Sequence, residues 1–172
     1  SGVPADDALG IGKNAGAMTL LHEIGHALGL NHSFEGNVFS NQNKYLDSSQ
    51  YTVMSYTNDK NAGVWIDDKF VFTVSSTPML LDIASLQHLY GAQETTNLGD
   101  TIYKFDNDMP FAKAIWDSGG DDDLLDFSNF ATDLIVSLVP GTSSTISTTI
   151  PTGTWKMSDN LGIADNALIE NI

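Results

Sequence analysis

The chain has 172 residues, of which 41% are hydrophobic, so it is long enough to bury a core as one domain or two small ones. Its 22 acidic residues outnumber its 7 basic residues, all lysine, and give a formal net charge of −15. This charge argues against nucleic acid and membrane surfaces as partners, because both bind clustered cations. The absence of cysteine excludes disulfides and thiolate metal sites, and no apolar run is long enough to span a membrane.

The first predicted element is a helix over residues 14–28. Apolar residues recur at helical spacing from Met18 to Leu28. Gly29 follows, and glycine readily adopts the left-handed conformation that ends a helix. We therefore expect the chain to turn sharply at Gly29.

A long loop and a second helix come next. Residues 31–77 are rich in Asn, Ser, Asp and Gly, and within them only the run VWIDDKFVFTV (64–74) suggests strand. A helix is then predicted with Thr77 as its N-cap, Pro78 at its first position and Gly91 as its C-cap.

Beyond Gly91 the sequence changes to short β-type runs separated by Gly and Asp turns. These runs are TIYKF (101–105), KAIW (113–116), DLLDFS (123–128), DLIVSLV (133–139) and STISTTI (144–150). Such spacing is typical of an antiparallel sandwich or roll. We predict an α+β chain with two domains, residues 1–92 and an all-β region over residues 93–172.

Three of the four histidines fall within the stretch HEIGHALGLNH. On a helix, His22 and His26 are four residues apart and project from the same face, as two ligands of one metal must. The turn at Gly29 brings His32 towards them as a third ligand. Glu23 lies too far around the helix to be a ligand, but its carboxylate can take a proton from water held at the metal.

Three neutral nitrogens leave one open position on a tetrahedral zinc ion, and water bound there has a pKa of about 7. The pattern therefore predicts a catalytic zinc site rather than a closed structural one. The plain alternative is that HExxH arose by chance on an amphipathic helix. The full spacing HExxHxxGxxH disfavours that alternative.

With this motif the chain resembles the metzincin metallopeptidases, whose second mark is a methionine turn under the metal. The stretch YTVMSYT supplies such a turn, with Met54 as the turn residue. In the astacin and serralysin branches a tyrosine two positions later approaches the zinc. The resemblance thus implies that Tyr56 is a fourth, displaceable zinc ligand that stabilises the oxyanion.

The serralysin branch is favoured by two further stretches. TPMLLDIASLQHLYGA is similar to the helix that closes the serralysin catalytic domain, and WDSGGDDDLLDFS is similar to the entry of its calcium-binding β-roll. The resemblance runs from about Thr19 to the C-terminus. It implies the C-terminal part of a metzincin catalytic domain (zinc helix, Met-turn loop and closing helix), followed by an all-β sandwich or the start of the roll. His88 receives no metal role.

Calcium is the second metal implied. Of the 18 Asp residues, eleven fall at or after Asp100, and short carboxylates in Gly-rich loops suit this ion. A solvated acidic turn is the alternative for the Asp run alone. The resemblance implies one site formed by Asn97 and Gly99 carbonyls, the Thr101 hydroxyl, Asp117, Gly119 and Asp122. It implies a second formed by Gly120, Asp122, the Leu168 carbonyl and Glu170. The family has Arg where Asn97 stands, an exchange that a carbonyl ligand tolerates.

Two departures from the family affect these expectations. The full GGxGxDxUx array of the roll is absent, and the family has roughly a hundred more residues before its zinc helix, which form the upper rim of the cleft. We therefore expect an N-terminal segment or a partner chain to complete the catalytic domain and cover the apolar face of the helix. The alternative is a compact relative that has dispensed with the sheet that forms this rim.

The resemblance implies a secreted, extracellular bacterial zinc endopeptidase that acts on proteins or peptides and binds Zn2+ and Ca2+. One alternative is a calcium-dependent structural or adhesive module with a vestigial zinc site. The presence of both Glu23 and Tyr56 disfavours it. Another is a zinc-storage or zinc-sensing protein, which would bind the metal without cleaving peptides.

Overall fold

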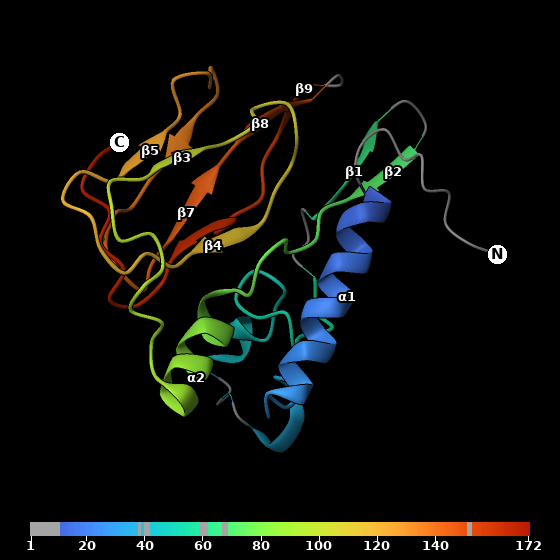
Figure 1. Cartoon of the computed structure of the whole chain (residues 1–172). Coiled ribbons are helices and arrows are strands. Elements are labelled where there is room, and N and C mark those ends of the chain that lie inside the picture. The colour runs from blue at the N-terminus through green and yellow to red at the C-terminus, as the bar shows by residue number, and fades with distance from the viewer. Residues whose placement is uncertain (1–10, 38, 40–41, 59–61, 67–68, 151–152) are drawn as a thin grey trace.

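The computed structural model describes residues 11–37, 39, 42–58, 62–66, 69–150 and 153–172. Two helices and a β-hairpin lie beside a region of short strands (Figure 1). The helices are α1 (Ile11–Ala27) and α2 (Leu80–Tyr90), and the hairpin is formed by β1 (Gly63–Ile66) and β2 (Lys69–Phe72). Neither helix, within the residues described, is long and apolar enough to cross a membrane.

The first helix ends as predicted. Gly29 has φ +90°, and its N–H donates to the His26 carbonyl (3.0 Å) while the Leu30 N–H donates to the Gly25 carbonyl (2.9 Å). These two bonds form the Schellman motif, which satisfies carbonyls that the helix end would otherwise leave open. The chain consequently reverses within a few residues of His26.

The second helix begins later than the sequence predicts. Its N-cap is Met79, not Thr77. The Thr77 hydroxyl instead accepts a hydrogen bond from the Ala114 N–H (2.8 Å), a residue of strand β4. Asp82 caps the helix by accepting the Met79 N–H (2.8 Å). The end at Gly91, with φ +83°, is confirmed.

The region after α2 is built from short strands. They are β3 (Ile102–Lys104), β4 (Lys113–Ile115), β5 (Leu124–Asp126), β6 (Leu134–Ile135), β7 (Ser143–Ile146), β8 (Thr148–Ile150), β9 (Gly153–Trp155) and β10 (Leu161–Ile163). Each predicted run contains a strand, and the run at 64–74 forms the antiparallel hairpin. Strands β9 and β10 were not predicted from the sequence.

The strand pairing corrects the expectation of an antiparallel region. One sheet has the order β4-β10-β7-β6, in which β10 lies parallel to β4 and antiparallel to β7. Strands β3 and β5 also pair in parallel. Parallel neighbours require distant segments to meet, and the local turn signals used for the prediction carry no such information.

Two hydrophobic clusters connect the helices to the strands. The larger lies in the β region and includes Phe105, Leu125 and Leu161. The other joins Met54 and Met79 to Ala114 of β4. Side chains of α2 pack against both clusters. The domain division at residues 92 and 93 stays a prediction.

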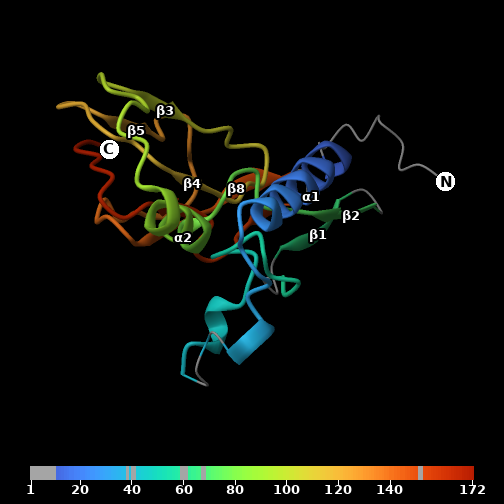
Figure 2. The same ribbon diagram turned by 60° about the horizontal axis from the view of Figure 1, so that its bottom comes forward.

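The loop between α1 and the hairpin positions the functional side chains. It contains two short 3-10 helices, η1 (Glu35–Asn37) and η2 (Lys44–Leu46), and projects away from both helices (Figure 2). Its later part, around Met54, folds back between them. The last turns of α1 and α2 also meet, because the Tyr90 hydroxyl donates to the Leu28 carbonyl (2.9 Å).

Candidate metal centre

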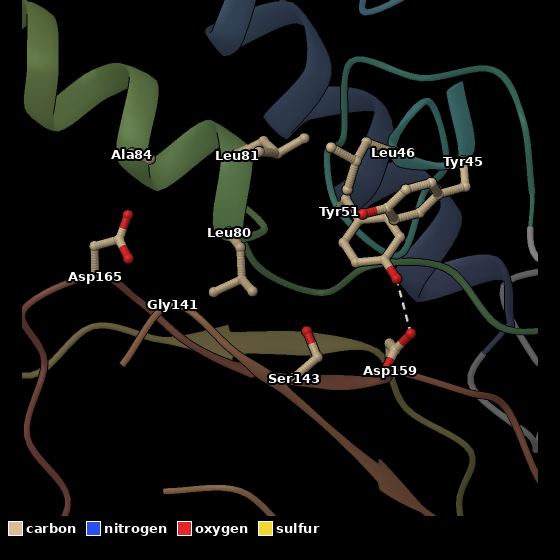
Figure 3. Close-up of a pocket in the computed structure, with 10 residues that line it drawn as sticks. All are labelled: Tyr45, Leu46, Tyr51, Leu80, Leu81, Ala84, Gly141, Ser143, Asp159 and Asp165. Atoms are coloured by element: carbon tan, nitrogen blue, oxygen red, sulfur yellow. Dashed lines mark hydrogen bonds between the residues drawn. The ribbon is translucent and has the colours of Figure 1, made fainter. Parts of the chain in front are cut away.

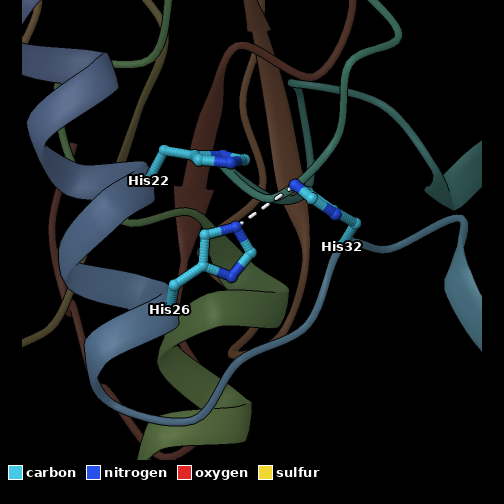
Figure 4. A group of neighbouring side chains, drawn as sticks. All are labelled: His22, His26 and His32. Atoms are coloured by element: carbon cyan, nitrogen blue, oxygen red, sulfur yellow. Dashed lines mark hydrogen bonds between the residues drawn. The ribbon is translucent and has the colours of Figure 1, made fainter.

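The structure brings His22, His26 and His32 together at the end of α1 (Figure 4). One ring nitrogen from each lies within 4.8 Å of the others. Among the described residues, these three histidines are the side chains whose ligand atoms lie close enough together to hold one metal ion. His22 is buried, with 6% of its surface exposed, and the other two rings are half-buried.

The opposite nitrogen of each ring is held by a hydrogen-bond acceptor. The Nδ1 atoms lie 2.7 Å from the Val53 carbonyl for His22, 2.8 Å from the Leu30 carbonyl for His26, and 2.8 Å from Glu35 Oε1 for His32. Since each acceptor requires a donor, these contacts assign a proton to every Nδ1. The Nε2 lone pairs are then free to bind a metal.

The lone pairs converge so closely that the geometry suits a cation between them. His26 Nε2 and His32 Nε2 are 3.1 Å apart. Two unprotonated nitrogens at this distance repel each other unless a proton or a metal lies between them. Zinc–nitrogen bonds of 2.0–2.1 Å in a tetrahedron separate the nitrogens by roughly 3.4 Å. The His26–His32 pair is therefore spaced for a zinc ion, and the third nitrogen, from His22, lies within 4.8 Å of both.

Met54 packs beneath the helix turn that carries the two α1 histidines. It is buried, with 2% of its surface exposed. A Cβ atom built on Gly25 would lie only 2.6 Å from the Met54 sulfur. Gly25 is thus required for Met54 to approach the helix backbone between His22 and His26.

Tyr56 lies against the histidine rings, and Glu23 directly follows His22 in α1. The Tyr56 hydroxyl is 2.9 Å from His32 Nε2, and its ring stacks on the His22 ring with centroids 5.5 Å apart. Both Tyr56 and Glu23 are exposed. Their hydroxyl and carboxylate can therefore meet a molecule that enters from solvent.

Asp82 fixes the Met-turn, the loop around Met54. This role was not predicted from the sequence. The buried carboxylate of Asp82 accepts hydrogen bonds from the Thr52 hydroxyl (2.5 Å) and the Val53 N–H (2.8 Å), as well as from Met79. The Val53 carbonyl in turn fixes His22. Burial raises the pKa of Asp82, although these hydrogen bonds oppose the shift. The sequence does contain a signal for this role, because Asp82 is an acidic residue within the apolar stretch PMLLDIA.

Glu35 is the other residue missed. It follows the last histidine by three positions and accepts from its Nδ1. A carboxylate on the far nitrogen orients a metal-binding imidazole and makes it a better ligand.

The first set of predicted calcium residues is linked by hydrogen bonds. The Thr101 hydroxyl donates to the Gly99 carbonyl (2.9 Å), and Asp117 accepts from the Gly119 N–H (3.0 Å). Tyr103 connects Asn97 to Asp117, because its hydroxyl accepts from Asn97 and donates to Asp117. Asp117 is fully buried.

Two residues of the second predicted set, Gly120 and Glu170, lie close to Asp123. The Asp123 N–H donates to Glu170 Oε2 (2.9 Å), and a Cβ on Gly120 would lie 2.7 Å from the Asp123 carboxylate oxygens. Asp122 is exposed and accepts from the Asn171 side chain (2.6 Å). Leu168 is also exposed.

Asp123 was not identified from the sequence, which places it third in a run of aspartates. Its side chain is 0% exposed. Oδ1 accepts from the Thr101 N–H (2.7 Å), whereas Oδ2 has no hydrogen-bond partner within the described part of the chain. Burial, together with the charges of Asp117, Glu170 and Asp100, raises the pKa of Asp123. Oδ2 of Asp123 is thus an unsatisfied polar atom on a buried carboxylate that lies near other acids.

A separate cleft of about 280 Å3 lies between α2, the η2 segment and the sheet (Figure 3). The Tyr51 hydroxyl bridges it by donating to Asp159 (2.7 Å). The neighbouring Gln50 side chain donates to the Ser158 carbonyl. No metal-centre residue lines this cleft, but the two bonds tie the loop that precedes Met54 to the β region.

Several known proteins have sequences similar to this chain. The sequence model described as "Metallo-peptidase family M12B Reprolysin-like" matches residues 10–71, which include the three histidines and Met54. Serralysin from Proteus mirabilis is 36% identical over 176 residues, which cover 92% of this chain and 33% of that protein. Serralysin C from Dickeya chrysanthemi is 36% identical over 91% of this chain and 34% of its own length.

A serralysin from Photorhabdus luminescens is also 36% identical, over 91% of this chain and 34% of that protein. The chain spans about a third of the length of the curated relatives it matches. The similarity runs through the metal-centre loop and onward across nearly the whole chain. Over that third of their length, the chain is similar to the serralysin-type metzincin metallopeptidases.

Proposed function

We propose that this chain carries the zinc centre of a secreted endopeptidase that hydrolyses peptide bonds in proteins or peptides. The observation that carries the proposal is the convergence of three Nε2 atoms whose opposite nitrogens are all held by acceptors. Zinc bound there supplies a Lewis acid and lowers the pKa of water to about 7. The serralysin relatives support this function.

Two side chains of this chain perform the proton and charge steps. The Glu23 carboxylate accepts a proton from the attacking water and passes it to the leaving amine. The Tyr56 hydroxyl donates a hydrogen bond to the oxygen of the scissile carbonyl as negative charge develops on it. Both groups are exposed, Tyr56 in contact with His32 and Glu23 next to His22 in the sequence, so a peptide can reach them from solvent.

Substitution of Glu23 tests the proposal. Glu23→Ala should keep one zinc per chain and abolish casein hydrolysis, because the three nitrogens remain while the base is lost. The matched control is Glu94→Ala, which removes an equally exposed carboxylate outside the centre. Zinc content and turnover are measured together. If zinc is lost along with activity, Glu23 is a ligand and not the base.

We further propose that calcium binds in the β region, at the residues implied by the family resemblance. Asp117, Gly119 and Thr101 would contribute to one site, and Gly120 and Glu170 to another. The unpartnered oxygen of Asp123 supports its inclusion beside, or in place of, Asp122. The ion would neutralise carboxylates that are otherwise buried close together.

A further polypeptide segment, or a partner chain, is proposed to cover one face of α1. Leu20, Ile24 and Leu28 are exposed along it, Leu20 by 62%. Contiguous apolar surface of this kind marks an interaction site. The 172 residues alone should therefore self-associate in sedimentation experiments and hydrolyse casein poorly. A fully active monomer would contradict this expectation.

A further inference from the structure

Phe34 is an aromatic side chain that lies beside the metal centre without belonging to the described hydrophobic clusters. It follows His32 by two residues, and 47% of its surface is exposed. Exposing a large apolar ring costs free energy that burial would recover. Its position therefore calls for a reason other than packing.

The ring is held in a defined place by its neighbours. It stacks on the His32 imidazole, with 4.9 Å between centroids and only 9° between planes. The Tyr56 ring lies 5.2 Å away and is tilted by 49°. Phe34 thus stacks on the His32 ring and lies close to the Tyr56 ring, while 47% of its surface is open to solvent.

These two rings form an apolar corner next to the position of the reacting carbonyl. The Tyr56 hydroxyl, which would contact that carbonyl, lies 2.9 Å from His32 Nε2. Consecutive Cα atoms of a peptide are about 3.8 Å apart, so a residue that flanks the scissile bond can place its side chain against Phe34. Aromatic contacts favour a large apolar or aromatic side chain there, by about 0.5–1.5 kcal/mol beyond the burial itself.

We infer that Phe34, together with Tyr56, is a specificity-determining surface that selects substrates with a large apolar or aromatic side chain next to the scissile bond. The inference rests on the proposed peptidase function. Glu35 lies beside this corner with Oε1 engaged by His32 Nδ1, so preference for a cationic side chain is the competing outcome that the test must separate. The surface differs from the Glu23 machinery because it discriminates among substrates and takes no part in proton transfer.

The test compares kcat/KM for paired quenched-fluorescent peptides with the zinc-loaded natural protein. The pairs differ only in Phe against Ala at each position that flanks the cleaved bond, and Arg is included as a third residue. At one of these positions the wild type should prefer Phe, and Phe34→Ala should reduce the Phe-to-Ala ratio about tenfold. Phe34→Tyr should retain the preference. The matched control, Tyr45→Ala, removes an aromatic residue that is 63% exposed but lines the separate cleft, and should leave the ratio unchanged.

Each outcome separates this inference from the proposed function. If the zinc-loaded wild type cleaves none of the peptides, the proposed function fails. If the peptides are cleaved but Phe34→Ala keeps the Phe preference, or if Arg is preferred at the Phe34-dependent position, the inference fails alone. An equal fall for all peptides together with zinc loss would mean that Phe34 only supports His32, and would also overturn it.

Discussion

At the scale of single residues, the metal centre depends on contacts made on the far side of each ligand. The sequence motif identifies the three histidines, but two backbone carbonyls and Glu35 decide which nitrogen faces the metal. Orientation of this kind lowers the entropy lost on metal binding, because the rings are already directed at a common point.

The close approach of Met54 to the helix leads to a prediction about Gly25. Gly25→Ala should lower the thermal midpoint and weaken zinc retention, because the new methyl group would lie 2.6 Å from the Met54 sulfur. Overpacking of this type costs about 1–3 kcal/mol. Gly16→Ala is the matched control, since a Cβ there meets nothing within 4 Å. Equal melting curves for the two variants would contradict the packing described.

The hydroxyl of Tyr56 gives a second prediction at this scale. Tyr56→Phe should reduce kcat about tenfold or more and change KM little, because the hydrogen bond strengthens as charge develops on the carbonyl oxygen. Steady-state kinetics on one quenched peptide measure both constants. A rise in KM with unchanged kcat would instead assign Tyr56 to substrate binding.

At the scale of elements, α2 supports the Met-turn through a single buried carboxylate. Asp82 joins the first turn of α2 to Thr52 and Val53. An ionised carboxylate accepts several hydrogen bonds at once, but burial removes its hydration. The helix therefore does more than fill space behind the metal centre, since it fixes the backbone that holds His22.

This burial predicts how Asp82 contributes to the pH dependence of stability. Its pKa in the folded state lies above the ordinary 3.8, so in the interval between these values the folded protein holds a proton that the unfolded chain has released. The stability contribution of Asp82 therefore falls as pH rises through that interval. Asp82→Asn cannot titrate, yet its amide can still accept from Val53 and donate to Thr52.

Urea unfolding of the metal-free wild type and of Asp82→Asn, from pH 4 to pH 8, measures this effect. The free energy of unfolding of the wild type should fall relative to that of the variant as pH rises above about 4. A constant difference across the range would show that Asp82 does not titrate differently in the two states.

The elements also show what a sequence can predict. The positions of His22 and His26 follow from helical periodicity, and Gly29 signals the turn to His32, so this part of the centre was predicted from local rules. The beginning of α2 was not, because Thr77 uses its capping hydroxyl on Ala114 of a distant strand. Asp123 was indistinguishable from its two aspartate neighbours until the fold buried it.

At the scale of the whole molecule, the net charge of −15 leads us to predict that calcium binding stabilises the folded protein. Calcium at a hundredfold excess over its Kd should raise the free energy of unfolding by about 2.7 kcal/mol. The melting temperature should rise accordingly. Asp123→Asn should abolish the calcium response and stabilise the calcium-free protein, because a buried charge is removed. Asp122→Asn tests the ligand implied by the sequence, and Asp133→Asn is an exposed control. A melting temperature that is insensitive to both calcium and EGTA would contradict the proposed sites.

The bonds from Gln50 and Tyr51 to the β region have a consequence for biosynthesis. Their acceptors, on Ser158 and Asp159, lie 108 positions later in the chain. At about 5–20 residues per second, a ribosome needs roughly 5–20 s to add that length. During this interval the histidines already exist, but the loop before Met54 lacks its anchors. The metal ligands are therefore synthesised well before the loop that positions them is anchored, and the assembled centre is delayed until Ser158 and Asp159 have been translated.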